Sequence, residues 1–333
     1  MKLSRVAALG IAVVLVGSVP SARGNGQKSD IDAIGNRRVA HRAMISQEKE
    51  IAIGKQYSQE VERQAKLITD PVINEYVNRV AQNVARNSDL KIPLTVKVID
   101  APGINAFALP GGFLYVNSGL LQTADEEAQV AGVVGHEIAH VACRHWASQM
   151  TKATLLQYAT IPLIFTPMSY PVYIGVAQAL NFGVPMAFLK FSRNDEAEAD
   201  YFGLQYMVKA GYDPAAYEAI FSKVIEEERR VPGSVPKIFM DHPPTPDRML
   251  QIDQEMKAFP KRDQYLVSTS EFDDVKARLS QVINNRKKEK QQEGPTLKKR
   301  ESTEQTATQP ADQNKKDSGD DTPPVLKRRD GSN

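Results

Sequence analysis

Two stretches in the first quarter of the chain carry apolar residues at helical spacing. The first begins near Ser46, which can cap a helix, and Glu48 and Glu50 place negative charge in its first turn. The second begins at Asp70-Pro71, where an aspartate cap is followed by a proline suited to the first helical position. We therefore predict two antiparallel helices that begin at these residues.

Residues 92–99 change to an alternation of period two, which predicts a β-strand. Residues 105–117 predict two further short strands, joined or bent at Pro110, Gly111 and Gly112. Because paired glycines let another backbone approach closely, this segment has two interpretations. One is a sheet edge to which an extended peptide adds as a further strand. The other, favoured by composition alone, is an ordinary hairpin turn.

The remaining apolar pattern predicts helices. One begins near residue 124 and runs to about Met150, and later ones begin near Asn194 and Ala215. A short helix after Arg248 and an amphipathic one around residues 275–283 complete the pattern. We therefore predict an α+β fold that is mostly helical, with a small antiparallel sheet flanking the helix that begins near residue 124.

Residues 153–189 contain no charged side chain, and four prolines interrupt them. Because proline breaks a helix, no apolar helix of membrane-spanning length remains in this stretch. Three interpretations stay open: a hairpin that dips into a membrane, an apolar lid over a functional site, and ordinary core helices.

The two ends of the chain differ from its middle. Two basic residues, an uncharged apolar run and then small residues indicate a secretory signal peptide over residues 1–24, with an uncleaved membrane anchor as the alternative. Residues 25–45 are polar and predict a flexible lead-in. Residues 286–333 have almost no large apolar side chains, so we predict a disordered polar tail. One folded domain is therefore expected over residues 46–285.

Composition narrows the classes of function. The net charge is only +2 over 333 residues, which gives no support for nucleic-acid binding. The one cysteine, Cys143, excludes an intramolecular disulfide framework. The location is therefore predicted from the export signal alone: periplasm or cell envelope, with membrane association left open by residues 153–189.

The candidate chemistry centres on Gly-His-Glu-Ile-Ala-His at residues 135–140. On a helix, His136 and His140 project about 40° apart and one turn from each other, so both imidazoles can bind one metal ion. Glu137 lies at the edge of the same face, where its carboxylate can reach a metal-bound water. This spacing indicates a zinc-dependent peptidase, which needs a third protein ligand and an open fourth position.

The third ligand is expected among the acidic residues downstream. Glu196 and Asp200 share a helix face, so one carboxylate can bind the metal while the other accepts a hydrogen bond from a ligand histidine. Glu196 is therefore the preferred ligand. Asp195 and Glu198 could fill the same role, and an acidic helix start also suits the helix dipole without any metal.

Two neighbours of the motif are not expected to bind the metal. Cys143 returns to the metal-facing side but lies a turn beyond His140, and a buried free cysteine more often serves as a small apolar residue. His145 lies about 180° from His136 on a continuous helix. We therefore predict that His145 points away from the metal and has a packing or surface role.

Four motifs in this order resemble the gluzincin metalloproteases of the HtpX and CAAX-prenyl-protease type, in particular their exported BepA-like branch. They are the segment 105–121, the His-Glu-x-x-His motif, the acidic segment 192–200, and His242-Pro-Pro followed by Arg248. The resemblance covers about residues 45–260. The ordered combination is far more specific than His-Glu-x-x-His alone.

The resemblance implies a zincin-like metalloprotease domain with one Zn²⁺ per chain. It gives Glu137 the role of general base and places Asp200 beside a ligand histidine. His242 would lie near the metal, where it either stabilises the oxyanion or reversibly occupies the open position, and Arg248 would support it. The edge strand that receives substrate would be Pro110, Gly111 and Gly112, and the zinc ligands would be His136, His140 and Glu196.

The expected activity is hydrolysis of peptide bonds in extended or misfolded proteins of the cell envelope, by a zinc-bound water that Glu137 activates. The alternative is an envelope assembly factor or chaperone in which His242 keeps the zinc site mostly closed. A non-proteolytic zinc hydrolase is disfavoured, because a strand-like Gly-Gly edge suits a peptide backbone. The expected partners are unfolded protein substrates and, for residues 153–189, a membrane surface.

Overall fold

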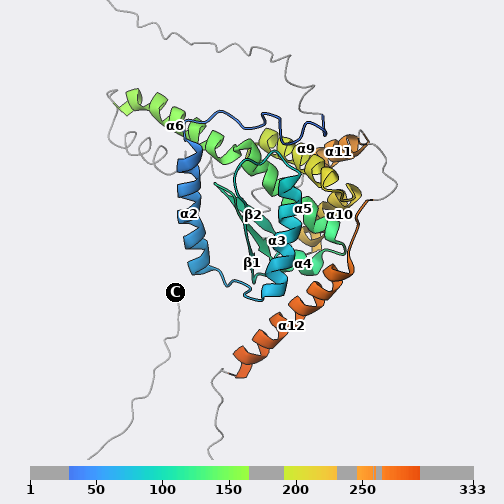
Figure 1. Ribbon diagram of the computed structural model, residues 1–333. Helices are drawn as coiled ribbons and strands as arrows, with labels where there is room; N and C mark the ends of the chain where they lie inside the picture. The colour runs from blue at the N-terminus through green and yellow to red at the C-terminus, as the bar shows by residue number, and fades with distance from the viewer. Residues whose placement is uncertain (1–29, 165–190, 231–245, 258, 260–264, 293–333) are drawn as a thin grey trace, which may run out of the picture. The chain divides into compact units, whose positions relative to one another are not determined.

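The computed structural model describes residues 30–164, 191–230, 246–257, 259 and 265–292. The chain divides into two units, residues 1–289 and 290–333, and nearly all described residues belong to the first. The described elements are mostly helices with one three-stranded sheet, so the α+β fold class is confirmed (Figure 1). In chain order they are α2 (Gln47–Gln64), α3 (Pro71–Arg86), β1 (Thr95–Ile99), β2 (Ala106–Leu109), β3 (Phe113–Asn117), α4 (Ser118–Thr123), α5 (Glu127–Cys143), α6 (His145–Ile164), α9 (Arg193–Lys209), α10 (Ala215–Arg230), α11 (Pro246–Met256) and α12 (Ser270–Gln292).

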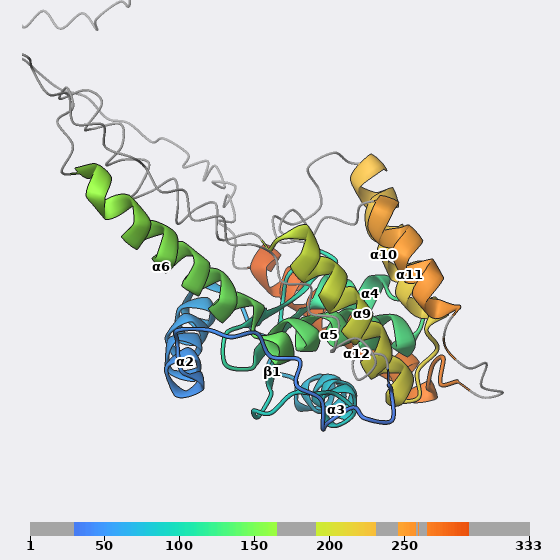
Figure 2. The ribbon, with the colours of Figure 1, turned by 90° about the horizontal axis from the view of Figure 1, so that it is seen from above.

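Helix α5 lies at the centre of these elements, and all of its residues are buried. Helices α3, α9 and α10 and strand β2 pack against it, and Figure 2 shows α9 running beside it. The approach of α9 is close, because a Cβ on Gly203 would lie 2.8 Å from the backbone nitrogen of His136. Glycine permits this contact, which brings the acidic start of α9 next to the histidines of α5.

The predicted helix starts follow local capping signals. The Ser46 side chain accepts a hydrogen bond from the backbone of Lys49, and Asp70 accepts two from the first turn of α3. Helix α9 begins with a capping box, in which the Ser192 and Asp195 side chains each bond to the backbone of the other. The expected starts of α2, α3 and α9 are therefore confirmed.

The sheet has the strand order β1-β3-β2. Strands β2 and β3 form an antiparallel hairpin, whereas β1 runs parallel to β3. The prediction of an antiparallel sheet is therefore wrong for one pair, and the sheet is mixed. The chain reverses twice between β1 and β3, so both strands run the same way, and an alternating apolar pattern carries no information on strand direction.

Pro110, Gly111 and Gly112 are the buried turn between β2 and β3. Both glycines have positive φ, at 78° and 86°. A Cβ on Gly111 would lie 2.5 Å from the Cα of Ile51, so the turn packs directly against α2. This corrects the expectation that these three residues are the edge that receives substrate. The outer strand of the described sheet on the side of α5 is β2.

The helix of the histidine motif ends earlier than predicted, at Cys143. Arg144 adopts the left-handed conformation with φ of 57°, and α6 begins anew at His145. The Arg144 guanidinium donates hydrogen bonds to Glu50 Oε2 at 2.8 Å and to the carbonyl oxygen of Ile45 at 2.7 Å. Because these partners are remote in sequence, helical periodicity alone does not reveal the break.

The described part of the expected flexible lead-in, residues 30–45, makes buried contacts instead. Arg37 forms a buried ion pair with Asp89, at 2.6 Å between Nη2 and Oδ2, and donates a hydrogen bond to Gln205 Oε1 at 2.5 Å. Val39 belongs to the apolar core. The sequence pattern did not predict that this segment packs against the domain, because its main contact is made by the charged Arg37 and not by a row of apolar residues.

Several predicted segments lie wholly or partly outside the described residues, namely 1–24, 153–189 and 286–333. Helix α6 accounts for residues 153–164, and α12 continues to residue 292, so the beginning of the expected tail is helical. The lysine, glutamate and glutamine residues there are good helix formers, which explains the extension. Among the described helices, none is both long enough and apolar enough to cross a membrane.

Candidate metal centre

Three buried side chains converge between α5 and α9. The Nε2 atoms of His136 and His140 lie 3.0 Å apart, and each lies 3.5 Å from an oxygen of the Glu196 carboxylate. A tetrahedral ion with bonds of about 2.0–2.1 Å places its ligand atoms about 3.3 Å apart. The spacing and the donor set of two imidazoles and one carboxylate therefore fit a metal ion such as zinc.

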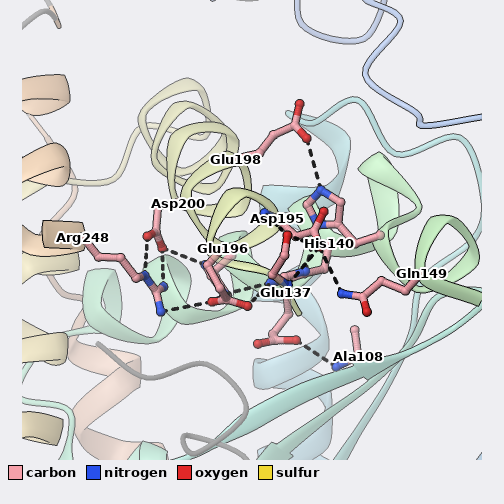
Figure 3. A network of polar contacts seen from close by, with 12 residues as sticks. Ala108, Glu137, His140, Gln149, Asp195, Glu196, Glu198, Asp200 and Arg248 are labelled. Carbon is pink, nitrogen blue, oxygen red and sulfur yellow. Dashed lines mark hydrogen bonds and ion pairs between the residues drawn. The ribbon is translucent and has the colours of Figure 1, made fainter. Parts of the chain in front are cut away.

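Glu137 connects the candidate centre to the sheet. Its carboxylate is buried, and Oε2 accepts a hydrogen bond of 3.0 Å from the backbone N–H of Ala108 in β2 (Figure 3). The residue next to a candidate metal ligand therefore lies against the outer strand. A carboxylate in this position can receive a proton from a water held between the metal ligands and β2.

The other ring nitrogen of His136 faces a polar cluster. Nδ1 lies 3.0 Å from Asp200 Oδ1 and 3.1 Å from the hydroxyl oxygen of Tyr217, which itself donates to Asp200 Oδ1 at 2.9 Å. When His136 Nδ1 carries the hydrogen and donates it to Asp200, Nε2 is left as the donor toward a metal. Asp200 therefore lies beside His136, one of the candidate ligands.

Arg248, from α11, joins the two carboxylates of this cluster. Its Nε and Nη2 each donate to one oxygen of Asp200 at 2.7 Å, and Nη1 lies 3.0 Å from Glu196 Oε2 (Figure 3). The expectation that Arg248 supports His242 is not tested, because His242 lies outside the described residues. Arg248 instead contacts the candidate ligand Glu196 and its neighbour Asp200.

The charged side chains in this cluster shift each other's pKa values. Burial lowers the pKa of His136, but the hydrogen bonds and negative charges of Asp200 and Glu196 outweigh it and raise the pKa to about 9. Burial also raises the pKa of Asp200, but the positive charge of Arg248 and the hydrogen bond to His136 bring it below its ordinary value. Without a metal, the raised pKa favours the positively charged, doubly protonated form of His136 at neutral pH, and a bound cation would displace the proton on one ring nitrogen.

His145 lies on the side of His140 opposite to the candidate metal, but its ring faces His140 instead of pointing away from the motif. It is fully buried, and its Nδ1 lies 2.9 Å from Nδ1 of His140. The prediction assumed a continuous helix, whereas the left-handed residue Arg144 turns the chain and brings the imidazole back toward His140. Cys143 is buried in the core and is not among the donor atoms that converge at His136.

The other acidic candidates for the third ligand have different places. Asp195 belongs to the capping box of α9 and also accepts a hydrogen bond from Gln149 at 3.0 Å. Glu198 lies apart from Glu196 (Figure 3), and its Oε2 is 3.3 Å from His145 Nε2 and 2.5 Å from His41 Nε2. Among the described residues, Glu196 is the carboxylate that joins His136 and His140.

Sequence reasoning missed the role of two residues near the centre. Tyr217 lies on the buried side of α10, where an apolar pattern does not separate a tyrosine that bonds to the site from one that fills the core. His41 lies in the polar lead-in, where nothing in the pattern indicates contact with the motif. Both contacts depend on packing between segments that are distant in sequence.

The fold and the donor set together define a zincin-like metallopeptidase domain. The chain belongs to peptidase family M48, whose sequence model matches residues 71–256. The matched region contains His136, Glu137, His140 and Glu196, together with the polar cluster around Asp200.

The chain is similar to several bacterial proteases. It is 32% identical over 219 residues to the putative beta-barrel assembly-enhancing protease of Vibrio cholerae, covering 64% of this chain and 45% of that protein. It is 28% identical over 292 residues to the beta-barrel assembly-enhancing protease of Escherichia coli K12, covering 86% and 58%. It is also 30% identical over 204 residues to the metalloprotease LoiP of Escherichia coli K12, covering 59% and 77%. The chain thus spans about half the length of the first two relatives.

Proposed function

We propose that this chain is a zinc-dependent endopeptidase that hydrolyses peptide bonds of extended or misfolded proteins in the cell envelope. The main supporting observation is that the side chains of His136, His140 and Glu196 converge, while the Glu137 carboxylate lies against the neighbouring strand β2. Membership of peptidase family M48 and the names of the relatives support the same conclusion.

Zinc is the proposed metal, one ion per chain, with His136, His140 and Glu196 as ligands. Two neutral imidazoles and one carboxylate are a common ligand set of catalytic zinc and leave a fourth position for water. Zinc bound there would supply Lewis acidity, which makes a water acidic and polarises a carbonyl group. The chain's own residues then orient the reactants and move the protons.

Glu137 is the proposed general base. Its carboxylate accepts the proton of the attacking water and then delivers that proton to the amine that leaves. Asp200 and Tyr217 hold His136 in the tautomer that turns Nε2 toward the metal, and Arg248 fixes both Asp200 and Glu196. His242 is proposed either to stabilise the oxyanion or to occupy the open position reversibly.

The proposed substrate is an extended segment of polypeptide. Strand β2 is the outer strand of the described sheet and contacts Glu137 through Ala108, so a peptide that adds along β2 would place a carbonyl group beside the base. Extended or misfolded chains present such segments. Because two relatives are named beta-barrel assembly-enhancing protease, β-barrel proteins before assembly are the substrates to test first.

The envelope location follows from the secretory signal expected over residues 1–24. Membrane contact is proposed for residues 153–189, because they carry no charged side chain and their four prolines leave no uninterrupted apolar helix of spanning length. Flotation of the exported chain with and without vesicles measures this contact.

The test compares casein cleavage by the wild type, Glu137→Gln and His242→Ala, each at equal zinc content. We expect Glu137→Gln to keep its zinc and lose cleavage by about 10²–10⁴-fold, because general base catalysis contributes about that much. A chelator should abolish wild-type cleavage. Near-normal cleavage by Glu137→Gln would rule out this residue as the base.

The His242→Ala variant separates the two roles proposed for that residue. Loss of an oxyanion donor lowers the rate by about 10²–10³-fold. Removal of a blocking ligand raises the rate instead. If zinc is bound and neither the wild type nor His242→Ala cleaves any unfolded protein, the alternative of an assembly factor with a structural zinc is favoured.

A further inference from the structure

A line of ring nitrogens and carboxylate oxygens leads away from His140 on the side opposite to the candidate metal. His140 Nδ1 lies 2.9 Å from His145 Nδ1, and His145 Nε2 lies 3.3 Å from Glu198 Oε2. The same oxygen lies 2.5 Å from His41 Nε2. The line begins at a buried ring and ends at His41, whose side chain is 36% exposed.

The chain builds this line from three separate segments. The left-handed residue Arg144 turns His145 back toward His140. The backbone N–H of His41 donates to the carbonyl oxygen of Cys143 at 2.8 Å, which fixes the lead-in segment at the end of α5. Glu198 comes from α9, two residues after the candidate ligand Glu196. A specific backbone arrangement therefore brings the three side chains together.

The hydrogen positions follow from the proposed metal site. If His140 binds the metal through Nε2, its hydrogen is on Nδ1, and His145 Nδ1 must accept it. The hydrogen of His145 is then on Nε2, where it faces the Glu198 carboxylate. Each ring is thereby held in one tautomer. The arrangement parallels that of His136, whose Nδ1 contacts the carboxylate of Asp200 directly.

We propose that His145 and Glu198 are positioning residues for the metal ligand His140. They fix its tautomer and ring orientation through a His–His–carboxylate relay, with His41 holding the outer side of Glu198. This inference rests on the proposed zinc site. Partners that hold a ligand histidine in this way typically change metal affinity by about 10–100-fold when they are removed.

The same cluster could instead bind a second metal ion, since ligand atoms of His41, His145 and Glu198 lie within 4.8 Å of one another. The contact between the two Nδ1 atoms argues against this. A metal on His145 Nε2 would put a hydrogen on its Nδ1, and that hydrogen would face the hydrogen on His140 Nδ1 across 2.9 Å. Avoiding the clash requires removing a proton from a neutral imidazole, so the relay is favoured.

The test measures zinc content and zinc affinity of the full chain by competition with a chelating indicator. His145→Asn keeps an oxygen acceptor near the position of Nδ1, whereas His145→Leu removes it. We expect His145→Leu to bind zinc about 10–100-fold more weakly than the wild type, and His145→Asn to recover most of the loss. Glu198→Gln should weaken binding by about tenfold. Glu75→Gln, an exposed residue of α3, is the matched control and should bind zinc like the wild type.

A second readout separates positioning from a general effect on the fold. Cobalt substituted for zinc reports the geometry of the ligands, and we expect the cobalt spectrum to change in His145→Leu and Glu198→Gln but not in Glu75→Gln. Urea unfolding of the metal-free proteins should differ little between His145→Asn and the wild type. If His145→Leu does not fold, Glu198→Gln and His145→Asn still decide the question.

Three results would overturn the proposal. The first is zinc affinity unchanged in both His145→Leu and Glu198→Gln. The second is an equal loss in His145→Asn and His145→Leu, which would mean that the acceptor is irrelevant. The third is two zinc ions per wild-type chain, one of which is lost with His145. If the wild type binds no zinc at all, the proposed function itself fails, and this outcome is distinct from the other three.

Discussion

The two histidines of the candidate metal centre have different surroundings. His136 faces the carboxylate of Asp200 directly, and that carboxylate is enclosed by Arg248 and Tyr217 within the core. His140 faces another imidazole ring, that of His145, and reaches a carboxylate only beyond it. The carboxylate on this side, Glu198, is partly exposed.

This difference predicts how strongly the surroundings of each histidine should affect folding stability and metal affinity. On the His136 side of the metal-free protein, the positive charges of His136 and Arg248 balance the negative charges of Asp200 and Glu196. Removing one member of such a buried set leaves an uncompensated charge, which is strongly destabilising. On the His140 side, solvent reaches the carboxylate of Glu198 and an imidazole ring lies between it and His140, so changes there should affect metal affinity more than folding.

Arg248→Leu should have the largest effect on stability. It leaves Asp200 and Glu196 buried with one positive charge fewer, and we expect the free energy of unfolding to fall by about 3–5 kcal/mol. Urea unfolding of the metal-free protein measures this loss. His145→Asn should cost much less in the same experiment. Equal losses in the two variants would mean that the contrast between the two sides is not real.

The Arg248→Leu, Asp200→Asn double variant sharpens the same point. Removing the negative charge together with the positive one should recover part of the loss, because fewer buried charges then remain unpaired. A double variant as unstable as the sum of the two single variants would indicate that the residues do not interact.

Gly203→Ala should reduce the free energy of unfolding by an intermediate amount, and it should disturb the surroundings of both His136 and His140. The added Cβ would lie 2.8 Å from the backbone nitrogen of His136, so α9 must move away from α5. Overpacking of this kind costs about 1–3 kcal/mol. Because α9 carries Glu196, Asp200 and Glu198, zinc affinity should fall as well. Unchanged unfolding and unchanged zinc affinity would show that the close approach of α5 and α9 is not needed.

The effect of Glu255→Gln on stability should depend on pH. Burial and the negative charge of Asp200 raise the pKa of Glu255, on α11, to about 7. A carboxyl group with a raised pKa in the folded state takes up a proton on folding, so its contribution to stability is lost as pH rises. Wild type and Glu255→Gln should therefore be equally stable below about pH 4.5, and Glu255→Gln should be the more stable above about pH 7.

Metal-free protein is required for this comparison, because a bound cation would stabilise the charged carboxylate. Thermal unfolding between pH 4 and pH 8 measures the difference in stability between the wild type and Glu255→Gln. The control Glu75→Gln should be as stable as the wild type at every pH. Identical curves for wild type and Glu255→Gln at every pH would contradict the raised pKa.

Much of the fold was predictable because its signals are local. Ser46, Asp70 and Ser192 cap their helices through residues two or three positions away, so the sequence around each one suffices. Helical spacing alone also places His136 and His140 on one face of a helix. The remaining errors concern contacts between segments that are far apart in sequence.

The error at His145 is the clearest example. Its direction is set by the left-handed conformation of Arg144, which is held in turn by Glu50 and by the carbonyl of Ile45. No periodic pattern around residue 144 contains that information. The parallel pairing of β1 with β3 and the burial of Arg37 have the same origin, since each depends on packing that a linear pattern does not describe.

The most direct test of the metal site is zinc X-ray absorption on the purified chain, combined with zinc content. We predict one zinc ion per chain, bound only by nitrogen and oxygen atoms at about 2.0–2.1 Å, with the scattering pattern of two imidazoles. Glu196→Ala should lose most of this zinc. A sulfur ligand at about 2.3 Å, which would have to come from Cys143, or a folded wild-type chain without zinc would contradict the assignment of His136, His140 and Glu196.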